Sequence, residues 1–375
     1  MPTVDITVRC PVHDSFRVRQ VAGMFDVPLA EKSEATFRAD IPAIDEPWQI
    51  GLIVGPSGSG KTTVGKRVFG TSLYQARDWP PASAVIDAFG DLPIKEITGL
   101  LTAVGFSSPP SWVKPYAVLS NGERFRCDLA RALASGCMAR NDEIAAVDLA
   151  AWPVVAFDEF TSVVDRNVAQ VGSMAVARAI RGGRLRCRFV AITCHYDIAE
   201  WLAPDWVVDM ATGTCQRRSL RRPSIELRIF RCHRRAWEMF ARHHYLSGAL
   251  APTARCFLAT WRDTAVAFCA TLPVIGRRGH WRISRVVTLP DFQGIGIGMR
   301  LAEAVAQRHR AEGLRINITA SHPAVLAHCR ESPEWRMVRV LKTGSRSARR
   351  FIHNYRGSSG RAVVSFEYLG ADSAA

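Results

Sequence analysis

The chain has 375 residues, a formal net charge of +15 and 48% hydrophobic residues, which excludes wholesale disorder and leaves room for two folded domains. Only six of its 49 basic residues are lysines, and an excess of arginine favours a polyanionic partner such as nucleic acid. A compositional bias of the genome towards arginine would give the same excess. The longest nearly uncharged apolar stretch, 145–157, is shorter than the roughly 20 residues that a membrane-spanning helix needs, so we expect no membrane span.

The N-terminal sequence lacks the basic stretch and apolar run of a secretory signal, so we expect a cytoplasmic protein. Its ten cysteines are spread along the chain, without a CxxC pair or a histidine at zinc spacing. This spread favours reduced thiols over a disulfide scaffold or a zinc site.

Two segments make up the first part of the chain. Residues 1–47 carry apolar side chains with a period of two in 4–8 and again in 16–21, which predicts antiparallel strands. Residues 48–215 alternate apolar, strand-like runs with helical patterns, as parallel α/β folds do. We therefore expect a first domain over 1–215.

The second part begins after a polar, basic stretch at 216–224, where the periodicity stops and Pro223 disfavours a helix. This stretch is the expected linker. Residues 225–375 again mix strand and helix patterns, with strands expected at 256–260, 265–272, 281–289 and 362–368. The sequence thus predicts a second α/β domain over 225–375.

A glycine-rich loop follows the strand expected at Ile50–Val54. Residues 55–62 read Gly-Pro-Ser-Gly-Ser-Gly-Lys-Thr and precede a helical pattern, which is the context that a P-loop requires. The backbone N–H groups of such a loop wrap the phosphates of ATP, Lys61 reaches the β- and γ-phosphates, and Thr62 offers its hydroxyl to Mg²⁺. The expected ATP-binding residues are Gly55, Ser57, Gly58, Ser59, Gly60, Lys61, Thr62 and Thr63.

Two carboxylates follow another apolar strand, Val154–Phe157. A parallel sheet delivers the residues after its strands to the ligand crevice, so Asp158 can hold the Mg²⁺ shell and Glu159 can orient the attacking water. Between the two motifs, residues 119–123 read Leu-Ser-Asn-Gly-Glu. Alone, this segment indicates a helix that begins with a capping box.

Together these motifs resemble the ATP-binding cassette (ABC) ATPases. Residues 119–123 match the LSGGQ signature of that family, 162–165 match its D-loop, and His195 matches its switch histidine. The resemblance implies a γ-phosphate sensor at His195 and an ATP-dependent, head-to-tail homodimer. In that dimer, Ser120 and Gly122 of one protomer complete the ATP site of the other.

The resemblance also implies an aromatic residue that stacks on adenine upstream of the P-loop, for which Phe25 is the candidate. One departure concerns the interval between Lys61 and Ser120, which is shorter than in transporters and lacks a clear Q-loop glutamine. Transporters couple to their membrane domains through this interval. The departure favours a soluble ABC protein of the kind that works on nucleic acid or ribosomes.

The second domain contains another glycine-rich loop. Residues 290–298 read Pro-Asp-Phe-Gln-Gly-Ile-Gly-Ile-Gly and lie between a strand and the helix expected at 299–310, so a pyrophosphate could sit on the helix N-terminus. A dinucleotide-binding GxGxxG pattern does not fit, because its third glycine is missing. Residues 293–298 instead resemble the Q/R-x-x-G-x-G/A loop of the GCN5-related N-acetyltransferases (GNAT).

This second resemblance covers roughly 225–370. It implies that backbone amides bind the pyrophosphate of acetyl-CoA or another acyl-CoA, with Gln293, Gly294, Gly296 and Gly298 as site residues. Residues 321–328 resemble the second helix of the family, where His328 stands at a position usually held by a tyrosine acid. His328 is therefore either catalytic or a solvent-facing helix histidine.

A cluster at 243–247 reads His-His-Tyr-Leu-Ser. His244 and Tyr245 could line the acceptor pocket as a base and as a hydrogen-bond donor or stacking platform, or the cluster could simply end a surface helix. More loosely, the cluster and the loop after it resemble the phage Mom-type acyltransferases that modify adenine in DNA.

These observations predict an α/β protein in which an ABC-type ATPase domain is followed by a GNAT domain. The expected function is ATP hydrolysis coupled to acyl transfer onto a nucleic acid base, in DNA or tRNA. The alternative is a DNA-repair or chromosome-type ATPase whose GNAT-like domain only binds. Phosphate contacts are expected from two sets of arginines, Arg217, Arg218, Arg221 and Arg222 in the linker and Arg346, Arg349, Arg350, Arg356 and Arg361 near the C-terminus.

Overall fold

The computed structural model describes residues 3–11, 13–25, 32–137, 149–217, 225–244, 250–342 and 362–370. The chain forms two compact units that interleave along the sequence. The first unit comprises Met1–Ala76, Ser135–Val163 and Arg186–Arg222, and the second comprises Arg77–Ala134, Val164–Leu185 and Pro223–Ala375. The helical segments before and after the Asp158–Glu159 motif therefore pack with the C-terminal part of the chain.

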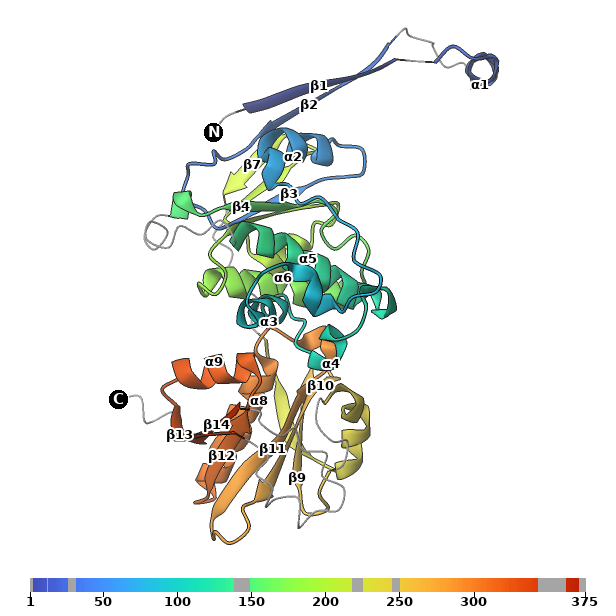
Figure 1. The fold of residues 1–375 in the computed structure, drawn as a ribbon. Coiled ribbons are helices and arrows are strands. Elements are labelled where there is room, and N and C mark those ends of the chain that lie inside the picture. Colours follow the sequence, from blue (N-terminus) through green and yellow to red (C-terminus); the bar gives the residue numbers. More distant parts are fainter. Residues whose placement is uncertain are drawn as a thin grey trace. The chain divides into compact units, whose positions relative to one another are not determined.

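The first unit is built on a five-stranded sheet in the order β4-β5-β3-β6-β7 (Figure 1). Its first four strands in this order are parallel, and β7 runs antiparallel to β6. Their bounds are β3 Ile50–Val54, β4 Val154–Phe157, β5 Arg188–Thr193, β6 Trp206–Asp209 and β7 Thr214–Arg217. The helix α2, Lys61–Phe69, packs on this sheet through Val64 and Phe69.

The N-terminal segment forms a long antiparallel hairpin of β1, Thr3–Pro11, and β2, Lys32–Asp40. The helix α1, Phe16–Phe25, lies at the far end of this hairpin (Figure 1). The strand predicted over 16–21 was therefore wrong. Val18, Val21, Ala22 and Phe25 recur at intervals of three and four, which is the helical spacing.

The second unit contains a group of helices from the middle of the chain: α3, Ile94–Ala103, α4, Pro109–Trp112, α5, Asn121–Cys137, as far as Ala134, and α6, Arg166–Arg181. The helices α5 and α6 touch where a Cβ at Gly172 would lie 3.0 Å from the Phe125 ring. Asp165 caps α6, because its Oδ1 accepts from the backbone N–H groups of Asn167 and Val168.

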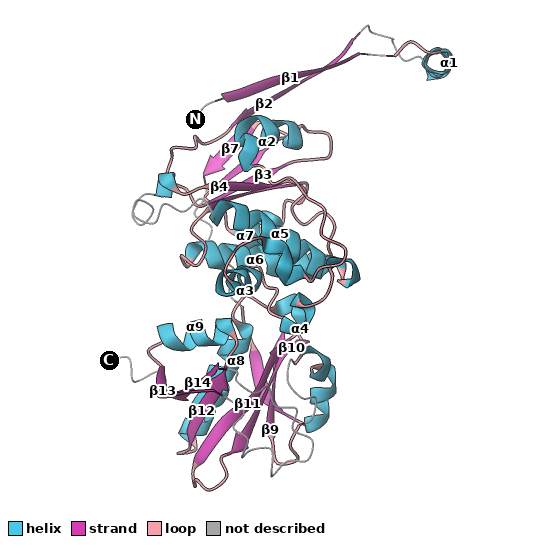
Figure 2. Ribbon diagram, viewed as in Figure 1, coloured by secondary structure: helices cyan, strands magenta, loops and turns pink. Residues whose placement is uncertain are grey.

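The C-terminal part of the second unit is a seven-stranded sheet in the order β13-β14-β12-β11-β10-β9-β8 (Figure 2). All its described neighbouring strands are antiparallel except β11 and β12. The strands are β8 Arg228–Cys232, β9 Arg255–Trp261, β10 Thr264–Pro273, β11 His280–Thr288, β12 Arg315–Ala320, β13 Trp335–Lys342 and β14 Ala362–Tyr368. The α/β class predicted from the sequence is confirmed.

Two helices belong to this sheet. The helix α8, Ile297–Ala311, buries Leu301 and Val305, and α9, Pro323–Glu331, follows β12. The remaining short elements are α7 Ile198–Leu202, η1 Gly70–Ser72, η2 Val85–Phe89, η3 Tyr116–Val118, η4 Leu149–Ala151, η5 Arg234–Met239, η6 Ala241–His243 and η7 Pro290–Phe292.

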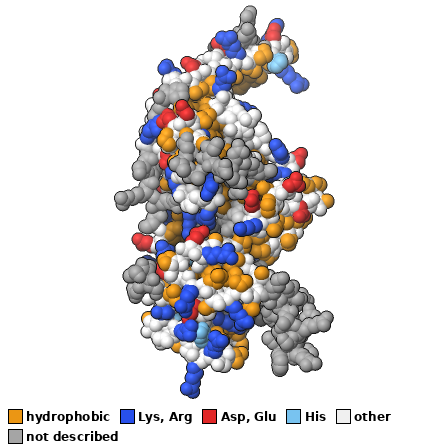
Figure 3. Space-filling view, turned by 60° about the vertical axis from the view of Figure 1, so that its left-hand side comes forward, with side chains coloured by type: hydrophobic (Ala, Val, Ile, Leu, Met, Phe, Trp, Pro, Cys, Tyr) orange, Lys and Arg blue, Asp and Glu red, His pale blue; other side chains and the backbone are white. Residues whose placement is uncertain are grey.

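Among the described residues, no helix is both long enough and apolar enough to cross a membrane. The described cysteines are free thiols, as the sequence predicts. Lys and Arg side chains occur at many places on the molecular face drawn in Figure 3, with fewer acidic side chains between them.

Candidate functional site

The P-loop lies in the first unit, between β3 and α2. Gly58 and Gly60 have φ values of 79° and 83°, the left-handed region that glycine adopts at no steric cost, and Gly60 is the N-cap of α2. The Nζ of Lys61 is buried and donates to the carbonyls of Gly55, at 3.0 Å, and of Pro56, at 2.8 Å. The loop thus turns successive amides and the α2 N-terminus towards one place, which is where an anion binds best.

A hydroxyl in this loop also fits a phosphate ligand. The Oγ of Ser59 is buried and has no hydrogen-bond partner among the described residues. Thr62 and Thr63 are half-buried in the first turn of α2. An ammonium, two threonine hydroxyls and an unpartnered serine hydroxyl form a donor set that suits a triphosphate with Mg²⁺.

Asp158 and Glu159 follow β4 directly. The Oδ1 of Asp158 accepts from the Glu159 N–H at 2.9 Å, and the Oε2 of Glu159 accepts from the Ser162 hydroxyl at 2.6 Å. Glu159 and the fully buried Thr161 have φ values of 51° and 68°, which are strained for residues other than glycine. Strain of this kind is concentrated at functional sites, because surrounding structure must hold it in place.

His195 follows β5, whose neighbours in the sheet are β4 and β3. Its backbone N–H donates to the Thr193 hydroxyl at 3.2 Å, and its side chain is half-buried. Since parallel strands end at the same edge of a sheet, the P-loop, the carboxylates and His195 all emerge at one edge. The structure therefore brings these sequence-predicted residues together within the first unit.

Phe25 does not lie near the P-loop. It is 70% exposed on α1, at the far end of the N-terminal hairpin from α2 (Figure 1). The aromatic residue beside the loop is Phe37 of β2, whose ring would be 2.4 Å from a Cβ at Gly60. The period-two pattern of this hairpin gives no signal that distinguishes Phe37 from other strand residues.

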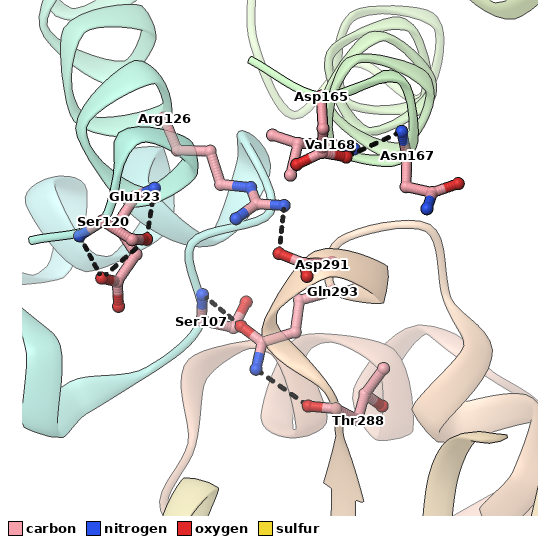
Figure 4. A network of polar contacts seen from close by, with 10 residues as sticks. All are labelled: Ser107, Ser120, Glu123, Arg126, Asp165, Asn167, Val168, Thr288, Asp291 and Gln293. Carbon is pink, nitrogen blue, oxygen red and sulfur yellow. Dashed lines mark hydrogen bonds and ion pairs between the residues drawn. The ribbon is translucent and has the colours of Figure 1, made fainter. Parts of the chain in front are cut away.

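The segment 119–123 lies in the second unit, at the start of α5. It forms a complete capping box: Ser120 donates to Glu123 Oε2 from its backbone at 3.0 Å and from its hydroxyl at 3.1 Å, and accepts from the Glu123 N–H at 3.3 Å (Figure 4). Ser120 is exposed. A Cβ at Gly122 would lie 3.2 Å from Val168, so this turn packs closely against the start of α6.

A pocket of about 400 Å³ lies in the second unit where β11 and β12 separate. These two strands pair only over His280–Ile283 and Arg315–Ile318. Beyond that point, Ser284 to Thr288 on β11 and Thr319 and Ala320 on β12 line the pocket instead of pairing with each other, while β11 still pairs with β10 and β12 with β14. Unpaired backbone groups on two diverging strands can bind the amide groups of an extended ligand.

The loop 293–298 forms one wall of this pocket. Gly294 and Gly296 have φ values of 87° and 92°, and Gly296 is the N-cap of α8, whose first turn contains no acidic residue. Gln293 is 8% exposed, and its Oε1 accepts from the Ser107 N–H at 2.8 Å while its Nε2 donates to the Thr288 carbonyl at 3.0 Å (Figure 4). The Gln293 side chain thus fixes the loop, and the amides of the α8 N-terminus are suited to an anion.

The pocket also gathers histidines. His328 on α9 and His244 after η6 both line it. The Nε2 of His328 is hydrogen-bonded to Oε1 of Glu303, a buried carboxylate on α8. A carboxylate that is hydrogen-bonded to an imidazole fixes the orientation and tautomer of the ring, which is the arrangement that a general base needs.

A third histidine, His322, is the N-cap of α9. Its Nδ1 accepts from the Ala324 N–H at 3.3 Å and its Nε2 donates to the Ser107 carbonyl at 3.2 Å. Burial lowers the pKa of His322 and, together with the charge of Arg242, that of His243, which also lines the pocket. These histidines therefore favour the neutral form.

Several residues singled out in the sequence lie outside the described part of the chain. They are Tyr245, Arg218, Arg221, Arg222, Arg346, Arg349, Arg350, Arg356 and Arg361. Within the described ranges, no group of three or more His, Cys, Asp or Glu residues could hold a metal ion by itself.

Residues 220–328 match the model of the acetyltransferase (GNAT) family. This match spans the 293–298 loop and ends at His328. The 293–298 loop, which leads into α8 in the second unit, lies within the matched residues. A comparison with curated proteins gives no match.

Solved structures of both kinds are similar to the chain. A Bacillus subtilis acetyltransferase in complex with CoA is 14% identical, with a TM-score of 0.30 over 38% of this chain and 98% of its own. The ribosomal-protein-S18-alanine N-acetyltransferase of Escherichia coli is 16% identical, with a TM-score of 0.30 over 38% and 93%. A bacterial ABC transporter cassette solved as a dimer is 14% identical, with a TM-score of 0.36 over 50% and 93%.

Proposed function

We propose that this protein is an ABC-type ATPase coupled to an acyl-CoA-dependent N-acyltransferase that modifies a nucleic acid base. The observation that carries the transferase half is the pocket at the separation of β11 and β12, whose wall contains the α8 N-terminus and His328, the residue that is hydrogen-bonded to Glu303. The boundaries 1–215, 216–224 and 225–375 remain our division of the chain into ATPase, linker and transferase.

In the ATPase half, Lys61 and the backbone N–H groups of 57–60 bind the phosphates, and the Ser59 hydroxyl adds a donor. Thr62 and Asp158 would hold Mg²⁺, which neutralises charge on the phosphates. Glu159 orients the attacking water, and His195 contacts the terminal phosphate. Phe37, rather than Phe25, is placed to cover the base, because its ring lies against Gly60.

In the proposed dimer, Ser120 and Gly122 of one protomer complete the ATP site of its partner. The capping box supports this role in a specific way: Glu123 holds the Ser120 hydroxyl at the exposed start of α5. A hydroxyl held at a helix N-terminus is suited to a phosphate brought by a second copy of the chain.

In the transferase half, an amine of the acceptor attacks the thioester carbon of acyl-CoA. The C–N bond forms as the C–S bond breaks, and His328 accepts the proton that the amine loses while Glu303 stabilises the resulting imidazolium. The departing thiolate takes up a proton from solvent. His244, and Tyr245 in the undescribed part of the chain, are the candidates for contacts with the acceptor base.

The net charge of +15 supports a nucleic acid as the acceptor. If Arg217, Arg218, Arg221 and Arg222 each contact a phosphate, the slope of log affinity against log salt concentration should be roughly −3.6 on duplex DNA. Exchange of the four arginines for glutamine should reduce this slope and weaken all sequences alike, because phosphate contacts position without specifying.

Ligand binding tests the two halves separately. We expect the purified chain to bind coenzyme A by calorimetry and to bind pantetheine, which lacks the diphosphate, far more weakly. Lys61→Ala should abolish ATP binding and leave coenzyme A affinity unchanged. A wild-type chain with no affinity for coenzyme A would overturn the transferase half and leave the ATPase half standing.

A further inference from the structure

The guanidinium of Arg178 lies directly against the 293–298 loop. Arg178 is in the last turn of α6, and a Cβ at Gly296 would lie 2.0 Å from its Nη1 and 2.7 Å from its Cζ. No side chain at position 296 could coexist with this arrangement, since the clash adds to the strain of φ 92°. Glycine at this position therefore permits the close approach of an arginine from a distant part of the sequence.

Arg178 and the loop also line the same pocket. The pocket of about 400 Å³ is lined by Arg178 together with Gly294, Gly296 and Gly298. The amides at the start of α8 and a guanidinium thus converge on one place, and both attract phosphate. No carboxylate in the first turn of α8 opposes them.

The 293–298 loop also contacts the segment that follows α3. A Cβ at Gly294 would lie 2.7 Å from the Cα of Gly105, so the backbone of the loop touches the backbone of the segment after α3. The Gln293 side chain bonds to the Ser107 N–H in the same segment. The 293–298 loop is therefore fixed against the segment that follows α3. Arg178 reaches the same loop from the last turn of α6.

A second arginine in the wall, Arg184, is less suited to the loop. It follows α6, and its charge interacts with that of Glu331, which lines the pocket too. Arg181 lies in the same last turn of α6 as Arg178 but is not part of the pocket wall. The three arginines therefore differ in their surroundings, and Arg178 is the one whose guanidinium reaches the loop.

We propose that Arg178 is a diphosphate-binding residue of the acyl-CoA site, so that a residue of the ABC-like region completes the coenzyme pocket of the transferase. This inference rests on the proposed function of the pocket. A guanidinium presents a planar fork of N–H donors that matches two phosphate oxygens, and it adds a positive charge that backbone amides lack. Tight coenzyme binding then requires 164–185 as well as 225–375.

The test measures coenzyme A and pantetheine affinities of the full chain by calorimetry for wild type, Arg178→Gln and Arg181→Gln. We expect Arg178→Gln to weaken coenzyme A binding by roughly 10- to 100-fold, as loss of a charge-assisted hydrogen bond does. Its pantetheine affinity should equal that of wild type, because pantetheine has no phosphate. Arg181→Gln, a matched change in the same helical turn, should leave both affinities unchanged.

Arg178→Lys serves as a second variant in case Arg178→Gln misfolds, because lysine keeps the charge and the long side chain. We expect it to bind coenzyme A several-fold more weakly than wild type, because an ammonium lacks the fork. Equal coenzyme A affinities in wild type, Arg178→Gln and Arg178→Lys would overturn the inference while the proposed function stands. Tighter binding by Arg178→Gln would overturn it too, because the arginine would then block the site.

Discussion

The guanidinium of Arg126 on α5 is 1% exposed and lies 3.7 Å from Oδ1 of Asp291 on η7 (Figure 4). Its Nε and Nη2 have no hydrogen-bond partner among the described residues. Burial lowers the pKa of Arg126, and the charges of Asp291, Glu123 and Asp165 oppose that effect. The helix α5 and the segment before the 293–298 loop thus share a buried guanidinium with two nitrogens that lack a described hydrogen-bond partner.

Substitutions of Asp291 and Arg126 should have opposite effects on the stability of the second unit. Asp291→Asn should destabilise the second unit by about 1 kcal/mol, because it removes the first counter-charge of a buried arginine, although Asp291 itself is half exposed. Arg126→Met should be neutral or stabilising, since a well-packed apolar chain needs no counter-charge. Urea denaturation measures both, and a loss of several kcal/mol in Arg126→Met would contradict the interpretation.

Glu159→Gln should separate ATP binding from hydrolysis. The amide keeps the size of the side chain and its place beside Ser162, but it cannot orient and polarise the attacking water. We expect hydrolysis to fall by about 100-fold or more while the variant forms a stable dimer in ATP. Size-exclusion chromatography with light scattering tests this, and a monomer at saturating ATP would count against the ABC-type assembly.

Glu303→Gln should slow acyl transfer without weakening coenzyme binding. The amide can still contact His328 but cannot stabilise an imidazolium, so we expect kcat to fall by roughly 100-fold at an unchanged coenzyme A affinity. Glu331→Gln is the matched control, because Glu331 lines the same pocket near Arg184. Equal rates in wild type and Glu303→Gln would remove the pair from the mechanism.

The buried His322 should make the stability of the folded protein depend on pH. Burial lowers its folded-state pKa below the ordinary value of 6.5, so the unfolded chain takes up the proton first as the pH falls. The folded state therefore loses stability below about pH 6.5, and protonation of Nδ1 also removes the cap on Ala324. His322→Asn keeps a capping acceptor without a titrating group. Its thermal unfolding temperature should fall less than that of wild type between pH 7 and pH 5.

The chemistry-bearing loops could be predicted from the sequence because each combines an unusual composition with a strand before it and a helix after it. The P-loop, Asp158, Glu159 and the 293–298 loop all lie where that context places them. The strands of the second sheet were predicted in part: β9, β10, β11 and β14 have the expected positions. The short strand β8 and the strongly basic β13 lack a clear alternating pattern.

The rest depends on contacts between segments that are far apart in the sequence. Glu303 has the pattern of an ordinary polar residue of an amphipathic helix, and only the fold shows that it is hydrogen-bonded to His328 of α9. Arg178 and Gly296 are likewise unrelated in sequence pattern. The sequence predicted that glycines in the 293–298 loop let a phosphate come close to the backbone. The structure shows that Gly296 also lets the Arg178 guanidinium come close to it.

Analysis of nucleosides by mass spectrometry tests whether the chain acylates a nucleic acid base. DNA and tRNA from cells that express the chain are digested and compared with those from cells that express Lys61→Ala or Glu303→Gln. We expect a nucleoside whose mass is increased by one acyl group in the wild-type sample and which is depleted with both variants. Unmodified DNA and tRNA nucleosides, alongside acyl transfer by the purified chain to a protein or a small amine, would contradict it.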